Sequence, residues 1–288
     1  MDLCELLSGE TPILLDGAMA TQLASFGLEM DGQNNVTHPE TVLTIHKAYA
    51  ESGCHILTTN TLTMNRLYIE THHLPVNVRE VNLAGVKLAK AAVSSDQYVL
   101  GDISSTGKML EPYGDLSESD ATETFKEQAS LLAEGGVDGF IIETMIDLRE
   151  ALCALQACKS IATLPVIVSM AFATTKRGGH TVMGNSSKEC AGVLAAAGAS
   201  AIGANCGDLH PSEMALIVSL LLEETSVPIV AQPNAGKPKL IGGHTVFDMS
   251  PPEFAAGILK CLEAGARLVG GCCGSSPEHI LAVREMLS

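Results

Sequence analysis

Residues 196–206 read AAGASAIGANC, and the pattern of this stretch occurs three more times in the chain. Each copy has the end of an amphipathic helix, a glycine, two residues, a short apolar run, and then polar or thiol residues. The other copies are AESGCHILTTN (50–60), EGGVDGFIIE (134–143) and EAGARLVGGCC (263–273). Such a glycine suits the left-handed position that ends a helix, and an uninterrupted apolar run suits a strand buried on both faces. The repeat therefore predicts helix-to-strand units of a parallel sheet.

Further units fill the chain between these four stretches. Apolar runs predict eight strands, at 13–19, 55–61, 98–104, 139–145, 165–172, 201–207, 228–234 and 267–274. Helical patterns alternate with them, near 40–52, 78–94, 118–134, 147–160, 187–197, 211–224, 251–264 and 277–287. Capping boxes with proline in the first turn, at 250–253 and 275–278, mark the starts of the last two helices.

Eight alternations of strand and helix predict the α/β class and a single (β/α)8 TIM barrel, with residues 1–288 as one domain. An open doubly wound sheet is the structural alternative. It would need a phosphate-binding loop after its first strand, and DGAMA at 16–20 lacks the glycine spacing of such a loop.

The composition fits a folded domain and excludes several classes of partner. The chain has 288 residues, of which 46% are hydrophobic, enough for a sizeable core. Its 17 basic and 33 acidic residues give a net charge of −16, which argues against nucleic acid and against anionic membrane surfaces. No signal peptide or membrane span is visible. With an odd number of cysteines, nine, we expect free thiols and a cytoplasmic location.

Reactive side chains recur at one height of the repeat. Seven residues after the repeated glycines come Asn60, Glu143, Asn205 and Cys272, and eight residues after them come Thr61, Thr144, Cys206 and Cys273. In a barrel these positions lie at the C-terminal ends of the strands, where active sites are built. Cys206 ends the sixth predicted strand, and Cys272 and Cys273 end the eighth, so the three thiols can converge. Three thiolates with an open fourth position are typical of a catalytic zinc site.

Two adjacent cysteines can reach one ion only if the backbone bends, which Gly270, Gly271 and Gly274 permit. A strained disulfide between Cys272 and Cys273 is one alternative. A small buried hydrophobe is the usual role of free cysteine, and it is our interpretation of five others: Cys54, Cys153, Cys158, Cys190 and Cys261.

Two histidines are rival metal ligands. His180 and His244 both lie in the repeated segment GGHTV, at 178–182 and 242–246. A Gly-Gly turn at a loop tip is the better explanation of both.

Three acidic residues are predicted at the same end of the barrel. Asp16 ends the first strand, Asp102 lies in the third, and Glu143 ends the fourth. Acidic side chains in a barrel mouth suit a substrate's ammonium group, although an internal salt bridge or a helix cap would also explain them. The case is weakest for Asp102, because an aspartate inside a strand is often a structural hydrogen-bond acceptor.

Four motifs give the chain a family resemblance: LDGAMAT (15–21), GANC (203–206), QPNAG (232–236) and GGCCG (270–274). They resemble the homocysteine S-methyltransferase family, which includes the homocysteine-binding barrel of cobalamin-dependent methionine synthase. The resemblance runs from Ile13 to about Leu287. It implies zinc-dependent methyl transfer to homocysteine, giving methionine.

The resemblance also assigns residues to roles. The family's zinc ligands fall on Cys206, Cys272 and Cys273. Its homocysteine-binding residues fall on Asp16 and its neighbour Gly17, and on Glu143. Asn234 falls where the family keeps a polar residue near the open position of the metal.

The methyl donor implied by the resemblance is a methyl-corrinoid (cobalamin) on a separate protein. The loop STGKMLEPYGD (105–115) and the start DGAM (16–19) look closer to the cobalamin branch than to users of betaine. S-methylmethionine remains the alternative donor. A different thiol acceptor, a demethylase running the transfer towards a carrier, and a non-catalytic zinc-holding subunit also remain open.

Overall fold

The computed structural model describes residues 2–241 and 244–288. Eight parallel strands form one sheet in the order β1-β12-β9-β8-β5-β4-β3-β2. Leu15 pairs with Ile56, and the Asp16 amide donates to the Ile56 carbonyl at 3.0 Å, so the sheet closes into a barrel. The strands are β1 (Ile13–Leu14), β2 (Ile56–Thr58), β3 (Tyr98–Ile103), β4 (Gly139–Met145), β5 (Val166–Met170), β8 (Ala201–Asn205), β9 (Ile229–Gln232) and β12 (Leu268–Val269).

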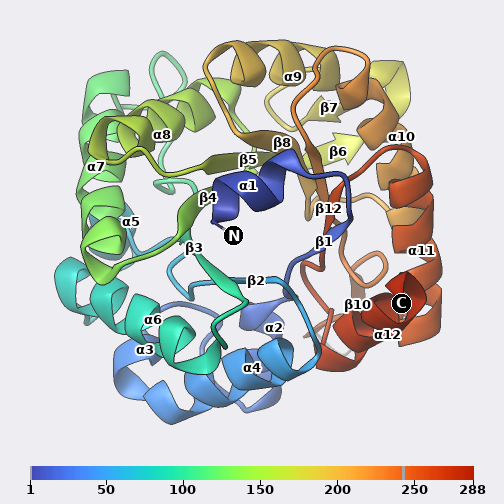
Figure 1. Cartoon of the computed structure of the whole chain (residues 1–288). Helices are drawn as coiled ribbons and strands as arrows, with labels where there is room; N and C mark the ends of the chain where they lie inside the picture. Colours follow the sequence, from blue (N-terminus) through green and yellow to red (C-terminus); the bar gives the residue numbers. More distant parts are fainter. Residues whose placement is uncertain (1, 242–243) are drawn as a thin grey trace.

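Helices surround this barrel in a ring (Figure 1). The eight that follow the predicted pattern are α4 (Pro39–Glu51), α6 (Val78–Ala92), α7 (Glu118–Gly135), α8 (Leu148–Ile161), α9 (Ser187–Ala196), α10 (Pro211–Leu222), α11 (Pro251–Glu263) and α12 (Pro277–Leu287). The predicted (β/α)8 barrel is confirmed. The first and last residues of each of these eight helices lie within two residues of their predicted positions. Within the described residues, no helix is long and apolar enough to cross a membrane.

The repeated glycines have the conformation that the sequence predicts. Gly53, Gly136, Gly198 and Gly265 have φ of 82°, 86°, 84° and 103°. Each lies just after a helix and a few residues before a strand. A left-handed residue there costs little for glycine and turns the chain sharply into the sheet.

Several elements were not predicted from the sequence. They are the short helices α1 (Leu3–Ser8), α2 (Met19–Ser25), α3 (Asn34–Thr37) and α5 (Arg66–Thr71), a 3-10 turn at Lys176–Gly178, and the hairpins β6–β7 (Phe172–Thr174 with His180–Thr181) and β10–β11 (Lys239–Ile241 with His244–Val246). All except α1 are insertions in loops at the C-terminal ends of strands.

Helix α1 lies across the opposite end of the barrel, at the centre of the view in Figure 1. Its Leu3 and Leu7 pack into the cluster that fills the barrel, with Ile13, Ile56 and Leu100 among others. The guanidinium of Arg267 donates to the carbonyls of Leu6 and Leu7 in the last turn of the helix. Helix α1 therefore closes the N-terminal end of the barrel.

Helix α12 starts where it is predicted, but its cap differs from the prediction. The capping box is formed by Ser276 and His279, because the Ser276 amide donates to His279 Nδ1 at 3.2 Å. Ser275 instead faces the barrel mouth. Its hydroxyl donates to the Cys272 carbonyl at 2.7 Å and accepts from the Ala18 amide at 3.0 Å. The predicted box at Ser250 and Glu253 is confirmed.

Candidate metal centre and substrate cavity

Three cysteine sulfurs meet at the C-terminal mouth of the barrel. The Sγ atoms of Cys206, Cys272 and Cys273 all lie within 4.8 Å of one another. Cys206 follows β8, the other two follow β12, and only β9 separates these strands. All nine cysteines are free thiols, so the alternative of a Cys272–Cys273 disulfide is wrong.

The backbone that carries Cys272 and Cys273 is fixed from both sides. The Cys272 amide donates to the Pro233 carbonyl at 2.9 Å, and the Cys273 carbonyl accepts from the Ala235 amide at 2.9 Å. Only Gly274 of the three expected glycines has positive φ, at 80°.

Gly270 and Gly271 are needed for a different reason. A Cβ at Gly270 would lie 2.8 Å from the Asp16 carbonyl oxygen, and one at Gly271 would lie 2.3 Å from Ser275 Oγ. These two glycines allow close packing of the strand end against the first strand and the α12 turn.

Cys206 reaches the cluster from a left-handed backbone conformation, with φ of 53°. This region is costly for a residue with a Cβ and is common at functional sites. Its amide donates to the Gln232 carbonyl at 3.1 Å, which fixes the turn out of β8. Hydrogen bonds from Cys272 and Cys273 lower the pKa of Cys206 to about 3, so this thiol is the first of the three to ionise.

Asn234 lies beside the cluster, where its side chain is hydrogen-bonded to Cys206 and helps to lower the pKa of that thiol. Its Nδ2 also donates to the Gly207 carbonyl at 2.9 Å, and its buried Oδ1 has no hydrogen-bond partner. The three converging sulfurs fit a tetrahedral thiophilic ion such as zinc, with its fourth position left open.

His180, one of the two rival histidines, does not join the cluster. His180 lies in strand β7, where its Nδ1 is 3.3 Å from the Lys176 carbonyl oxygen. The side chain of His244 lies outside the described residues. The five cysteines interpreted as buried hydrophobes are buried, on helices or at the start of a strand.

A cavity of about 140 Å³ adjoins the sulfurs. The three predicted acids, Asp16, Asp102 and Glu143, all line it together with Cys206, Cys272 and Cys273. Gly17 lines it too, and a Cβ there would lie 2.7 Å from Ser275 Oγ. The tertiary structure therefore brings the acidic and thiol positions of the repeat into one site.

The acids differ in how the protein holds them. Thr58 donates to Asp16 through its amide at 2.8 Å and its hydroxyl at 3.3 Å. These bonds favour the ionised form, yet burial dominates and raises the pKa of Asp16 to about 7. Burial, together with the charges of Asp16 and Cys206, raises the pKa of Glu143 to about 8. Such carboxyl groups are poised to ionise when a cation enters the cavity.

Two residues of the cavity need a new assessment: the case made from the sequence is weakest for Asp102, and Gln232 is not identified from the sequence as a site residue. Asp102 is buried, its Oδ1 has no partner, and burial raises the pKa of its carboxyl well above the usual range. Gln232 also lines the cavity with an unpartnered Oε1. Both residues sit two positions after an inward apolar residue, Leu100 and Val230, so the alternation of the strand could have pointed to them.

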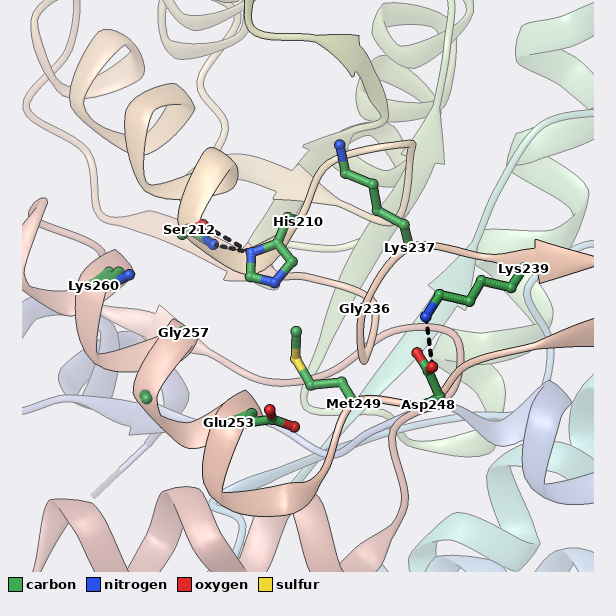
Figure 2. A pocket seen from close by; sticks show the side chains of 11 residues that line it. His210, Ser212, Gly236, Lys237, Lys239, Asp248, Met249, Glu253, Gly257 and Lys260 are labelled. Atoms are coloured by element: carbon green, nitrogen blue, oxygen red, sulfur yellow. Dashed lines mark hydrogen bonds and ion pairs between the residues drawn. The ribbon is translucent and has the colours of Figure 1, made fainter.

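A larger groove of about 570 Å³ lies beside the starts of α10 and α11 (Figure 2). Two of its lysines are in ion pairs: Lys239 contacts Asp248 at 2.6 Å and Lys237 contacts Glu213 at 2.8 Å. His210 Nδ1 lies 2.8 Å from Ser212 Oγ in the cap of α10. The groove is lined by no thiol and by no unpartnered buried acid, so the smaller cavity is the stronger candidate site.

Comparisons with known proteins concern the family and the fold of the chain. The family model of homocysteine S-methyltransferase matches residues 13–287. Methionine synthases of Mycobacterium leprae and Mycobacterium tuberculosis are each 29% identical over 98% of the chain, which spans about a quarter (25%) of their length. The metallated form of the homocysteine methyltransferase MmuM from Escherichia coli has the same fold, with a TM-score of 0.78, 21% identity and 99% of both chains covered.

Proposed function

The chain belongs to the homocysteine S-methyltransferase family, and we propose that it methylates the thiol of homocysteine, giving methionine. We propose that the reaction takes place at a zinc centre held by Cys206, Cys272 and Cys273. The convergence of the three sulfurs within 4.8 Å, in a cavity that also contains carboxyl groups, carries the proposal. An open three-thiolate site has little structural purpose, because structural zinc is closed by a fourth protein ligand.

Zinc at this position supplies the charge that keeps an acceptor's sulfur in its thiolate form at neutral pH. A free alkyl thiol has a pKa of about 8.5 and is mostly protonated there. Three cysteine thiolates around a divalent ion leave a net negative charge, which favours an electron-rich acceptor sulfur. The bond between sulfur and the methyl carbon forms as the bond from that carbon to its carrier breaks. The carrier keeps the electron pair, and the acceptor's thiol proton goes to solvent.

The chain's own residues orient the acceptor. Asp16 and Glu143 bind its ammonium group as carboxylates, and Gly17, next to Asp16, lines the same cavity. Asn234, whose side chain is hydrogen-bonded to Cys206, is the polar residue that we propose near the open position of the metal.

The zinc proposal is tested by Cys206→Ser, with Cys4→Ser as the matched control. Cys4 is an exposed free thiol on α1, at the opposite end of the barrel. We expect about one zinc per chain in the wild type and in Cys4→Ser. In Cys206→Ser we expect loss of zinc and of methyl transfer with the fold kept, as measured by metal analysis and circular dichroism. Full zinc occupancy and full activity in Cys206→Ser would refute the proposal.

We further propose a methyl-corrinoid on a separate protein as the donor. The support is the surface around the cavity, where loops at the barrel mouth expose large apolar side chains, such as Met30 (58% exposed) and Tyr113 (73%). Such side chains suit contact with a partner surface. Turnover of homocysteine with a methylated corrinoid is the expected result. Turnover only with S-methylmethionine would establish that donor instead.

A reducing compartment such as the cytoplasm suits this chemistry. All nine cysteines are unpaired, and three of them must stay reduced to bind a metal. We therefore propose that the chain works there as one barrel domain.

A further inference from the structure

Asn205 occupies the last position of β8, next to Cys206, and its side chain is fully buried. Its Oδ1 accepts from the Thr144 amide at 2.8 Å and from Ser169 Oγ at 2.8 Å. Its Nδ2 donates to Thr144 Oγ1 at 2.7 Å and towards Cys272 Sγ at 3.8 Å. One amide group thus uses both of its acceptor positions and both of its donors, and it links the end of β8 to β4, to β5 and to the segment after β12.

Thr144 is the residue most constrained by these bonds. It has φ of 59°, in the left-handed region that β-branched residues rarely adopt. The pairing of β4 with β5 shifts register between Ile142 and Met145, so the chain bulges where Glu143 and Thr144 lie. Both polar groups of Thr144 that could hold this bulge, its amide and its hydroxyl, are bound to Asn205. The direction of the Glu143 carboxyl into the cavity therefore depends on Asn205.

The same amide reaches the metal site. An N–H group directed at a cysteine sulfur restrains the position of that sulfur and takes up part of the charge of a thiolate. Cys272 Sγ is thereby tied to the turn that carries Glu143, although the two residues are far apart in the sequence. In the proposed function, Glu143 binds the ammonium group of the acceptor and Cys272 holds the ion that binds its sulfur.

We propose that Asn205 is a positioning residue that sets the separation between Glu143 and the sulfur of Cys272, and so selects the acceptor thiol by the length of its carbon chain. The inference rests on the proposed function. Homocysteine and cysteine differ by one methylene between the ammonium-bearing carbon and the sulfur. A site with a fixed separation between its two anchors distinguishes chains of these lengths, and a loosened site does not.

The test compares Asn205→Ala with Ser169→Ala. Asn205→Ala removes all four contacts, whereas Ser169→Ala removes one bond to the same Oδ1 and leaves those to Thr144 and Cys272 in place. We expect Asn205→Ala to raise the KM for homocysteine about tenfold or more. We also expect it to lower the preference in kcat/KM for homocysteine over cysteine, which one methylene can set at about 10- to 200-fold. The matched control Ser169→Ala should keep the KM for homocysteine and the preference over cysteine within about twofold of the wild type.

Two readouts do not depend on turnover of the zinc enzyme. Cobalt(II) bound in place of zinc has a thiolate charge-transfer band that reports the geometry of the three sulfurs, and we expect this band to shift in Asn205→Ala. Competition with a chelator measures metal affinity, which we expect to fall tenfold or more, as for other partners of metal ligands. Ser169→Ala keeps the wild-type band and affinity.

Thr144→Val serves if Asn205→Ala does not fold, because it removes only the hydroxyl bond on the Glu143 side. We expect it to raise the KM for homocysteine with the cobalt band unchanged, and Thr144→Ser to restore the wild-type KM. Unchanged KM, selectivity and cobalt band in the folded variants would overturn the role of Asn205. A wild type that shows no cobalt–thiolate band would instead overturn the zinc centre itself.

Discussion

At the scale of a single residue, the carboxyl group of Asp16 is subject to two opposing effects: burial disfavours its charge, and binding of a cation requires that charge. This carboxyl group is buried and lines the cavity, and Thr58 is its hydrogen-bond partner. Burial raises its pKa from 3.8 to about 7, so ionisation is costly without a bound cation. The folded state then binds the proton more tightly than the unfolded state, and stability falls as pH rises from about 4 to about 7. At about 1.4 kcal/mol per unit, the loss is at most about 4 kcal/mol.

Asp16→Asn should therefore stabilise the protein and impair binding. We expect its thermal midpoint without homocysteine to exceed that of the wild type at pH 8 and to approach it as the pH falls below about 4. Calorimetric titration with homocysteine should show an affinity at least tenfold lower, because an amide replaces a carboxylate beside an ammonium group. A lower midpoint at pH 8 would contradict this account.

His46 is a second buried titratable residue, remote from the sulfurs. It lies on α4 with its ring buried, and neither ring nitrogen has a hydrogen-bond partner. Burial lowers its pKa from 6.5 to about 4, so the folded state favours the neutral ring. The stability that this preference provides is complete above pH 6.5 and is lost as pH falls towards 4, by about 3 kcal/mol at most.

His46→Leu should lessen this acid sensitivity. We expect the drop in free energy of unfolding between pH 7.5 and pH 5, measured with urea, to be smaller than in the wild type. His38→Gln is the control, because His38 is exposed, and it should keep the wild-type drop. An equal drop in His46→Leu and the wild type would show that the ring is not responsible.

At the scale of elements, one buried carboxylate holds the loop between β3 and α7. Glu150 of α8 accepts from the amide and the hydroxyl of Thr106, both at 2.8 Å, and from Ser105 Oγ at 3.2 Å. The loop lies at the barrel mouth and exposes Tyr113. Its conformation thus depends on a residue of α8, which belongs to the next strand–helix unit of the chain.

Glu150→Ala should release this loop without unfolding the barrel. The Thr106 amide and hydroxyl would lose their acceptor in a buried position, at a cost of about 1–3 kcal/mol. We expect faster hydrogen exchange in peptides covering 105–116 and unchanged exchange in β8 and β9. Glu150→Gln keeps the shape and should give an intermediate rate. Equal exchange of the loop in Glu150→Ala and the wild type would refute the anchoring role.

At the scale of the whole molecule, the two ends of the barrel have separate tasks. Helix α1 closes the N-terminal end through Leu3 and Leu7, while the sulfurs and acids lie at the C-terminal end. In barrels of this type, residues at the N-terminal end contribute to stability and those at the C-terminal end to chemistry.

Leu7→Ala should separate these tasks. We expect the free energy of unfolding to fall by about 2–5 kcal/mol, as for other buried leucines, with kcat/KM for homocysteine at 25 °C within about twofold of the wild type. The substitution Cys4→Ala, on the exposed side of the same helix, should leave both unchanged. A large loss of kcat/KM in Leu7→Ala would show that the two ends are coupled.

The sequence by itself determined the order of elements and the cysteine set. Helix periodicity, apolar strands and the glycines at 53, 136, 198 and 265 act over a few neighbouring residues, so they can be read along the chain. The spacing from glycine to strand end placed Glu143, Cys206 and Cys272 at one height, because every unit climbs the barrel in the same way.

Only the tertiary structure decided how these groups meet. Cys206 and Thr144 adopt left-handed conformations that no local pattern of their residue types favours. Asn205 binds Thr144, Ser169 and Cys272 across three strands, and Asp102 and Gln232 turn unpartnered oxygens into the region beside the sulfurs. These contacts depend on barrel closure and on a register shift in β4. Barrel closure and the register shift both arise from the pairing of segments that are distant in the sequence. The local conformational preferences of a segment do not determine which distant segment it pairs with.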